Sequence, residues 1–141
     1  MNRISEIFLK ELIVEFRQKY ALGGIFLFSA TIVFLVYKVF NNVAGWEWSI
    51  MLWIITMFAG LNAIVKSFIQ EKRETYMYYY SLFNPLELII AKLLYNTLFL
   101  IGLFGLILFF MSWFLGYPVK DPALFFTGAL LGLCGLSIIL T

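Results

Sequence analysis

Four long apolar runs dominate the chain and decide what kind of fold it can adopt. They cover residues 20–37, 48–65, 88–115 and 123–141. Each is close to the length of helix that crosses the hydrocarbon core of a bilayer, and none has an ionisable residue at its centre. The apolar residues are continuous and do not alternate every second position, which favours helices over the strands of a barrel. The sequence therefore predicts an all-α integral membrane protein with about four transmembrane helices.

The overall composition agrees with a membrane environment. Of the 141 residues 63% are hydrophobic and only 13% are charged, whereas a soluble domain carries about 25% charged residues. A net charge of +2, with the basic residues placed between apolar runs, does not suggest a nucleic-acid partner. Membrane lipid is the expected surrounding of the single membrane domain, residues 1–141.

Residues 1–19 form a separate, charged segment before the first span. Ile4, Phe8, Leu12 and Phe16 recur at helical spacing, and most of the charged residues fall on the opposite side. This pattern predicts an amphipathic helix lying in the membrane interface. A soluble helix packed on a partner is the alternative.

The basic residues predict the orientation in the membrane. The N-terminal segment has four Lys or Arg residues and the stretch from Lys66 to Lys92 has another four, whereas the two other loops have one each, Lys38 and Lys120. Positively charged loops stay on the cytoplasmic side, so the N-terminus and residues 66–87 are expected in the cytoplasm. We expect a multi-pass membrane protein.

The chain lacks the residues that most catalytic sites need. It has no histidine, one cysteine (Cys134), no Walker A pattern and no H-E-x-x-H motif. We therefore expect a non-catalytic membrane protein that binds no cofactor directly, and the energy for any transport would have to come from a partner.

The central segment, residues 66–87, is the best candidate for contact with such a partner. A charged cluster in it is followed by a run of tyrosines, a combination enriched at protein interfaces. The candidate contact residues are Glu71, Lys72, Arg73, Tyr78, Tyr79 and Tyr80. Alternatively the tyrosines form an interfacial belt and the charges only set the orientation.

Four further residues are candidates for helix packing. Asn62 and Asn96 lie near the cytoplasmic ends of the second and third spans, where they are expected to form hydrogen bonds between helices, with a substrate role as the alternative. Gly128 and Gly132 have the G-x-x-x-G spacing that lets membrane helices approach closely.

Several blocks of residues are more specific than an apolar composition requires. They are Lys10–Leu12, Glu15–Leu22, Asn62–Phe68, Gln70–Glu71, Tyr78–Tyr80, Pro85 and Ala91–Asn96. Through them the chain resembles the haem exporter protein B (CcmB) family, the permease subunit of the cytochrome c maturation ABC-type complex, in the form found in Bacteroidetes-like bacteria.

The chain also departs from that family. The family's members have six spans, so we expect this sequence to be a C-terminally truncated form. Many relatives have a glycine soon after the acidic residue of the central segment, where this chain has Lys72–Thr75.

The resemblance implies a non-catalytic subunit in the bacterial inner membrane. The ATPase activity would lie in a separate partner, a cytoplasmic ABC ATPase that touches the central segment. The resemblance also implies a haem-handling membrane protein and a periplasmic haem chaperone, whose release would be coupled to ATP hydrolysis by the partner. The complex would handle the haem, and this chain would bind none. The alternatives are a permease fragment of another ABC exporter, carrying lipid, polysaccharide or drug, and a membrane assembly or scaffold protein without a transport cycle.

Overall fold

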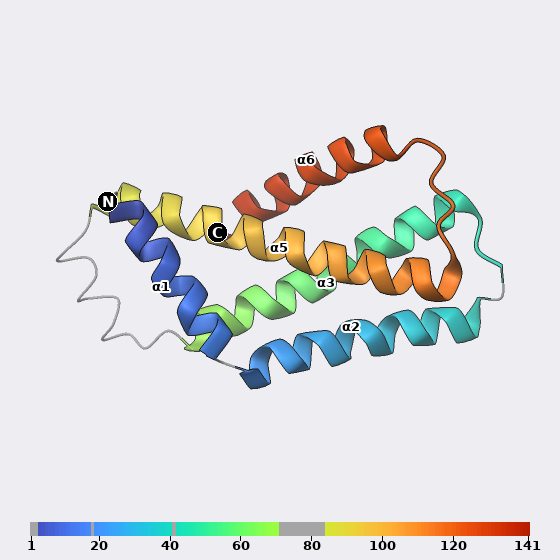
Figure 1. The fold of residues 1–141 in the computed structure, drawn as a ribbon, viewed down its shortest axis with the longest axis horizontal. Coiled ribbons are helices and arrows are strands. Elements are labelled where there is room, and N and C mark those ends of the chain that lie inside the picture. The colour runs from blue at the N-terminus through green and yellow to red at the C-terminus, as the bar shows by residue number, and fades with distance from the viewer. Residues whose placement is uncertain (1–2, 18, 41, 71–83) are drawn as a thin grey trace.

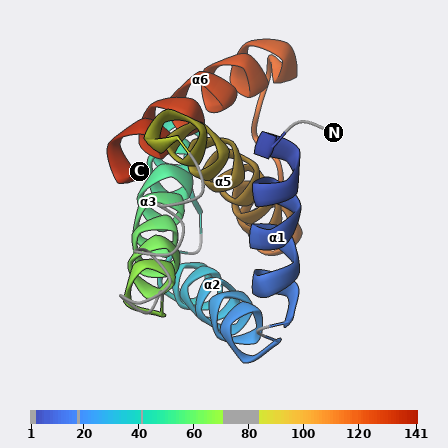
Figure 2. The same cartoon turned by 90° about the vertical axis from the view of Figure 1, so that its left-hand side faces the viewer.

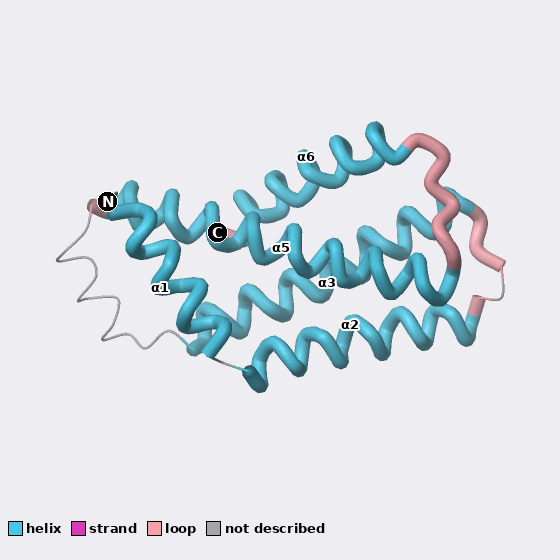
Figure 3. The backbone as a smooth tube through the Cα atoms, in the orientation of Figure 1, coloured by secondary structure: helices cyan, strands magenta, loops and turns pink. Residues whose placement is uncertain are grey.

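The computed structural model describes residues 3–17, 19–40, 42–70 and 84–141, and this part of the chain is helical. Its five helices are α1 (Arg3–Arg17), α2 (Lys19–Val39), α3 (Gly45–Gln70), α5 (Pro85–Leu115) and α6 (Pro122–Leu140). The predicted all-α fold is confirmed. The described loops join α2 to α3 and α5 to α6 at the same end of the bundle (Figure 3).

Three of the helices are long and apolar enough to cross a membrane. They contain the segments Gly45–Val65, Pro85–Leu115 and Pro122–Leu140, and α2 contributes the shorter apolar segment Gly23–Val39. Exposed apolar side chains cover their outer faces, among them Leu131 at 76% exposure and Ile139 at 79%. Such faces are stable only in a hydrocarbon solvent, and the chain is a multi-pass membrane protein.

Helix α5 is the central element of the bundle. It packs against each of the other four described helices, whereas α1 and α6 lie on its outer sides (Figure 2). The core forms mainly where α3 and α5 meet, around fully buried side chains such as Leu52, Leu100 and Ile107. With 31 residues α5 is about 46 Å long, well beyond the roughly 30 Å of a hydrocarbon core.

Local sequence signals explain where α5 and α6 begin and end. Pro85 and Pro122 each stand in the first turn, where a missing backbone N–H costs nothing. Helix α5 stops at Gly116, whose φ of +81° is a conformation that glycine adopts without strain. The Gly116 N–H donates to the Ser112 carbonyl oxygen at 3.2 Å and so satisfies one of the terminal carbonyls.

The N-terminal helix crosses one end of the bundle. Helix α1 is steeply inclined to the long helices and lies at the end where α2 begins, α3 ends and α5 begins (Figures 1 and 2). It packs against α5 and α2, with Ile7 buried and Glu6 exposed. The helix is amphipathic as predicted, and its apolar side is partly covered by its own chain. Its place in a membrane interface stays a prediction.

Candidate functional site

The predicted partner-binding residues belong to a part of the chain that the structure does not describe. Glu71, Lys72, Arg73 and Tyr78–Tyr80 all lie within residues 71–83. The neighbouring elements are described: α3 ends at Gln70 and α5 begins at Pro85. Both of these helix ends lie at the end of the bundle that α1 crosses (Figure 1).

A polar cluster joins α5 to α6 in the half of α5 nearest that end. Asn96 is 3% exposed, and its side-chain amide donates to the Thr141 hydroxyl oxygen at 3.0 Å. The Thr141 hydroxyl donates to the Ser137 carbonyl oxygen at 2.6 Å. Asn96 is thus bonded across to the end of α6, in an apolar surrounding where such a bond holds two helices in register.

The second half of the cluster consists of Thr97, which follows Asn96 on α5, and Ser137, one helical turn before Thr141 on α6. The Thr97 hydroxyl lies 2.7 Å from the Ser137 hydroxyl and 2.8 Å from the Leu93 carbonyl oxygen. The Ser137 hydroxyl lies 3.2 Å from the same carbonyl oxygen. Each hydroxyl has one hydrogen to donate, so one of them bonds to the carbonyl while the other bonds across to its neighbour. The three hydroxyl groups and the Asn96 amide nitrogen of this cluster all have partners, and the bonds of Asn96 and Thr97 join α5 to α6.

Asn62 is not part of this cluster. It is exposed on α3, whereas Asn96 is buried between α5 and α6. The two asparagines therefore occupy different surfaces, although the sequence suggested the same role for both.

The two predicted packing glycines also have different surroundings. A side-chain carbon at Gly132 would collide with the indole ring of Trp53 on α3, but Gly128 has no other heavy atom within 4 Å of that position. Only Gly132 allows a close approach of α6 to α3.

A third glycine, not singled out from the sequence, allows α3 and α5 to approach. A side-chain carbon at Gly60 would lie 2.7 Å from the terminal carbon of Leu100, which is fully buried. One turn or more away, the rings of Trp53 and Phe104 pack at a tilt of 41° across the same two helices, with centroids 5.9 Å apart. Nothing in the sequence distinguishes Gly60 from the other span glycines, because its partner comes from another helix.

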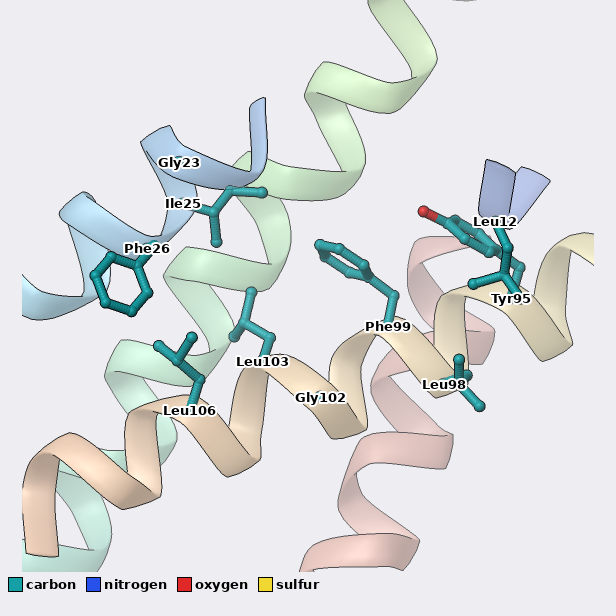
Figure 4. Close-up of a pocket in the computed structure, with 10 residues that line it drawn as sticks. All are labelled: Leu12, Gly23, Ile25, Phe26, Tyr95, Leu98, Phe99, Gly102, Leu103 and Leu106. Carbon is teal, nitrogen blue, oxygen red and sulfur yellow. The ribbon is translucent and has the colours of Figure 1, made fainter. Parts of the chain in front are cut away.

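An apolar groove lies between α5 and the helices α1 and α2. It has a volume of about 510 Å³, and the described residues that line it are one of α1, three of α2 and six of α5. They are Leu12, Gly23, Ile25, Phe26, Tyr95, Leu98, Phe99, Gly102, Leu103 and Leu106 (Figure 4). The Tyr95 hydroxyl is the one polar side-chain group among these residues, so the groove suits an apolar occupant.

Possible metal ligands are not grouped in the described part of the chain. Within residues 3–17, 19–40, 42–70 and 84–141, no group of three or more His, Cys, Asp or Glu residues could hold a metal ion. Cys134 is a free thiol on the exposed side of α6.

Comparison of the chain with protein-family models, with curated proteins and with solved structures found no match. The family resemblance and the activity, partners and cofactors that it implies therefore stay hypotheses.

Proposed function

We propose that the chain is the membrane subunit of an ABC-type complex that acts in haem delivery for c-type cytochrome biogenesis. In this proposal a separate cytoplasmic subunit hydrolyses ATP, and this chain couples the hydrolysis to release of a haem-loaded periplasmic chaperone from a haem-handling membrane protein. The basis is the set of sequence blocks that resemble the haem exporter protein B family.

One structural observation supports a coupling role above all others. The helices on either side of residues 71–83, α3 and α5, pack closely through the Gly60–Leu100 contact and through Trp53 and Phe104. Helix α6 is tied to α5 by the hydrogen bonds of Asn96 and Thr97. A force applied between the end of α3 and the start of α5 would therefore move three helices together, because packed interfaces shift as units.

The proposal includes α2 as a fourth span. Its 21 residues give a length of about 31 Å, close to the thickness of a hydrocarbon core. Lys38 at its end and Lys120 before α6 would then lie on the periplasmic side, with the N-terminus in the cytoplasm.

The coupling contact is tested by reversing charge in the central segment. Lys72→Glu combined with Arg73→Glu should abolish co-purification of the ATPase subunit, because two attractive contacts become repulsive. Lys120→Glu, an exposed residue at the other end of the bundle, is the matched control and should leave co-purification intact. Equal recovery of the ATPase with all three forms would refute the assigned contact.

The role in cytochrome biogenesis is tested by haem staining of membrane proteins on a denaturing gel. Deletion of the gene should abolish covalent haem staining, and the wild-type gene should restore it better than the Lys72→Glu/Arg73→Glu variant. Haem staining that survives the deletion would refute the role in cytochrome biogenesis. It would favour the alternative that the chain is the permease of another ABC exporter. A function insensitive to mutation of the partner's ATP site would instead favour a scaffold protein.

A further inference from the structure

The apolar groove between α1, α2 and α5 extends along the axis of α5. Leu12 and Tyr95 line it near the end of the bundle that α1 crosses, and Phe26 and Leu106 line it at the other extreme (Figure 4). Tyr95 and Leu106 are eleven positions apart on α5, which corresponds to about 16 Å of helix. One leaflet of a bilayer provides about half of the 30 Å hydrocarbon core, or about 15 Å. The groove is therefore about as long as one layer of acyl chains.

The depth of the groove in the membrane follows from the aromatic residues of α5. Trp113 and Tyr117, near the far end of α5, are the kind of residues that lie at a membrane interface. Counting about 20 residues of helix back from Trp113 gives the opposite interface near Leu93, two residues before Tyr95. The groove thus occupies the leaflet on the side of α1, from the interface to about the midplane.

A basic residue of α5 comes just before the part of the helix that lines the groove. Lys92 is partly exposed and lies one turn before Tyr95, and it shares a helix face with Phe99 because the two are seven residues apart. By the count from Trp113, Lys92 is at the edge of the hydrocarbon layer, where its ammonium group can reach the level of lipid headgroups. An apolar channel one leaflet deep with a cation at its entrance is complementary to an anionic phospholipid.

We propose that this groove is a binding site for an anionic phospholipid of the leaflet on the side of α1. One acyl chain lies in the channel beside Phe99 and Leu103, and the headgroup phosphate lies near Lys92. The open backbone at Gly23 and Gly102, where no heavy atom would meet an added side-chain carbon within 4 Å, leaves room for the chain. The site depends on membrane insertion and not on the identity of any ATPase partner.

The occupant is identified by photo-crosslinking from inside the groove. A benzophenone amino acid replaces Leu98, which lines the groove and is 50% exposed. Membranes containing the full chain are illuminated, and the purified chain is weighed by mass spectrometry. We expect adducts of phospholipid mass. Adducts with a second copy of the chain or with another protein would overturn the proposal, because the groove would then be a protein interface.

Filling the groove should remove the lipid adduct. Gly102→Trp and, from the α2 side, Gly23→Trp should each lower its yield at least fivefold. Gly105→Trp and Gly24→Trp place the same side chain on the same helices at exposed glycines outside the lining, and should leave the yield unchanged. Two independent pairs distinguish loss of the site from failure to fold. Yields that do not differ within either pair would mean ordinary boundary lipid and would overturn the proposal.

The headgroup preference is measured in vesicles of equal parts phosphatidylglycerol and phosphatidylcholine. With the crosslinker at position 98 the phosphatidylglycerol adduct should exceed the other about fivefold, the effect of one lysine near a surface, and Lys92→Gln should bring the ratio close to one. A crosslinker at Ile101, exposed on α5 outside the lining, reports bulk lipid and should give a ratio near one in both forms. Equal ratios at positions 98 and 101 would overturn the anionic assignment.

Discussion

Among single residues, Gly132 allows α6 to pack against α3 because it has no side-chain carbon. Gly132→Ala should destabilise the fold by about 1–3 kcal/mol, because the added methyl group collides with the rigid indole of Trp53 and forces α6 away from α3. Gly128→Ala, four residues earlier on the same helix, adds the same methyl group in open space and should change stability by less than about 0.5 kcal/mol. Unfolding in mixed detergent micelles measures both, and equal losses would contradict the contact.

Removal of the Thr97 hydroxyl should also lower the stability of the fold. Thr97→Val keeps the shape of the side chain but deletes its bond to Ser137, so we expect a loss of about 0.6 kcal/mol, the average for hydrogen bonds between membrane helices. Thr31→Val is the control, because the Thr31 hydroxyl is exposed and donates only to the Leu27 carbonyl of its own helix. The same unfolding assay applies, and a larger loss for Thr31→Val would mean that the cluster does not hold α5 to α6.

At this scale the sequence indicates which residues are unusual but not where they point. Asn96 and Asn62 are both polar residues in apolar helices, yet only Asn96 is buried against a partner. Ser137 and Thr141 are four residues apart, so the sequence places both on one face of α6. The sequence does not show that Asn96 and Thr97 of α5 lie opposite that face. Which faces oppose each other depends on the rotation of whole helices, and a single sequence does not record it.

Among the elements, α1 differs from the others because it crosses the bundle and does not run along it. Ile7 is 5% exposed and Ile13 is 64% exposed on the same helix. Ile7→Ala should cost about 2 kcal/mol, because it leaves a cavity where α1 packs, whereas Ile13→Ala should cost little. Unfolding in micelles compares the two variants. Similar small losses would mean that α1 lies free of the bundle, held by the interface alone.

The apolar runs predict the membrane helices, because a helix satisfies its own backbone hydrogen bonds in lipid. They predict the first and last residues of these helices less accurately. Helix α3 begins at Gly45 and continues to Gln70, beyond the run at 48–65, since polar residues at a membrane surface remain good helix formers. Helix α5 begins at Pro85, three residues before the expected start, where proline fits the first turn. The central position of α5 was not predicted, because its apolar residues surround the helix and indicate no preferred face.

For the whole molecule, the number of crossings is decided by α2. Helices α3, α5 and α6 are long apolar candidates, and the apolar part of α2 is shorter. If α2 crosses, positions before and after it lie on opposite sides of the membrane. If it does not, they lie on the same side while α3 still separates residues 42 and 84.

Single cysteines introduced into a Cys134→Ala background distinguish these two arrangements. Glu6, Asn42, Asn84 and Lys120 are exposed residues outside the apolar segments, so cysteines there should react with a maleimide once it reaches them. With four crossings and a cytoplasmic N-terminus, a membrane-impermeant maleimide added to intact cells should label positions 42 and 120, and positions 6 and 84 only after permeabilisation.

Labelling of positions 6 and 42 together would mean three crossings. In that case α2 would lie along the surface, the groove could not span a leaflet beside it, and both the fourth span and the lipid site would be wrong. If α2 crosses the membrane, the same helix supplies the fourth span and one wall of the lipid-binding groove.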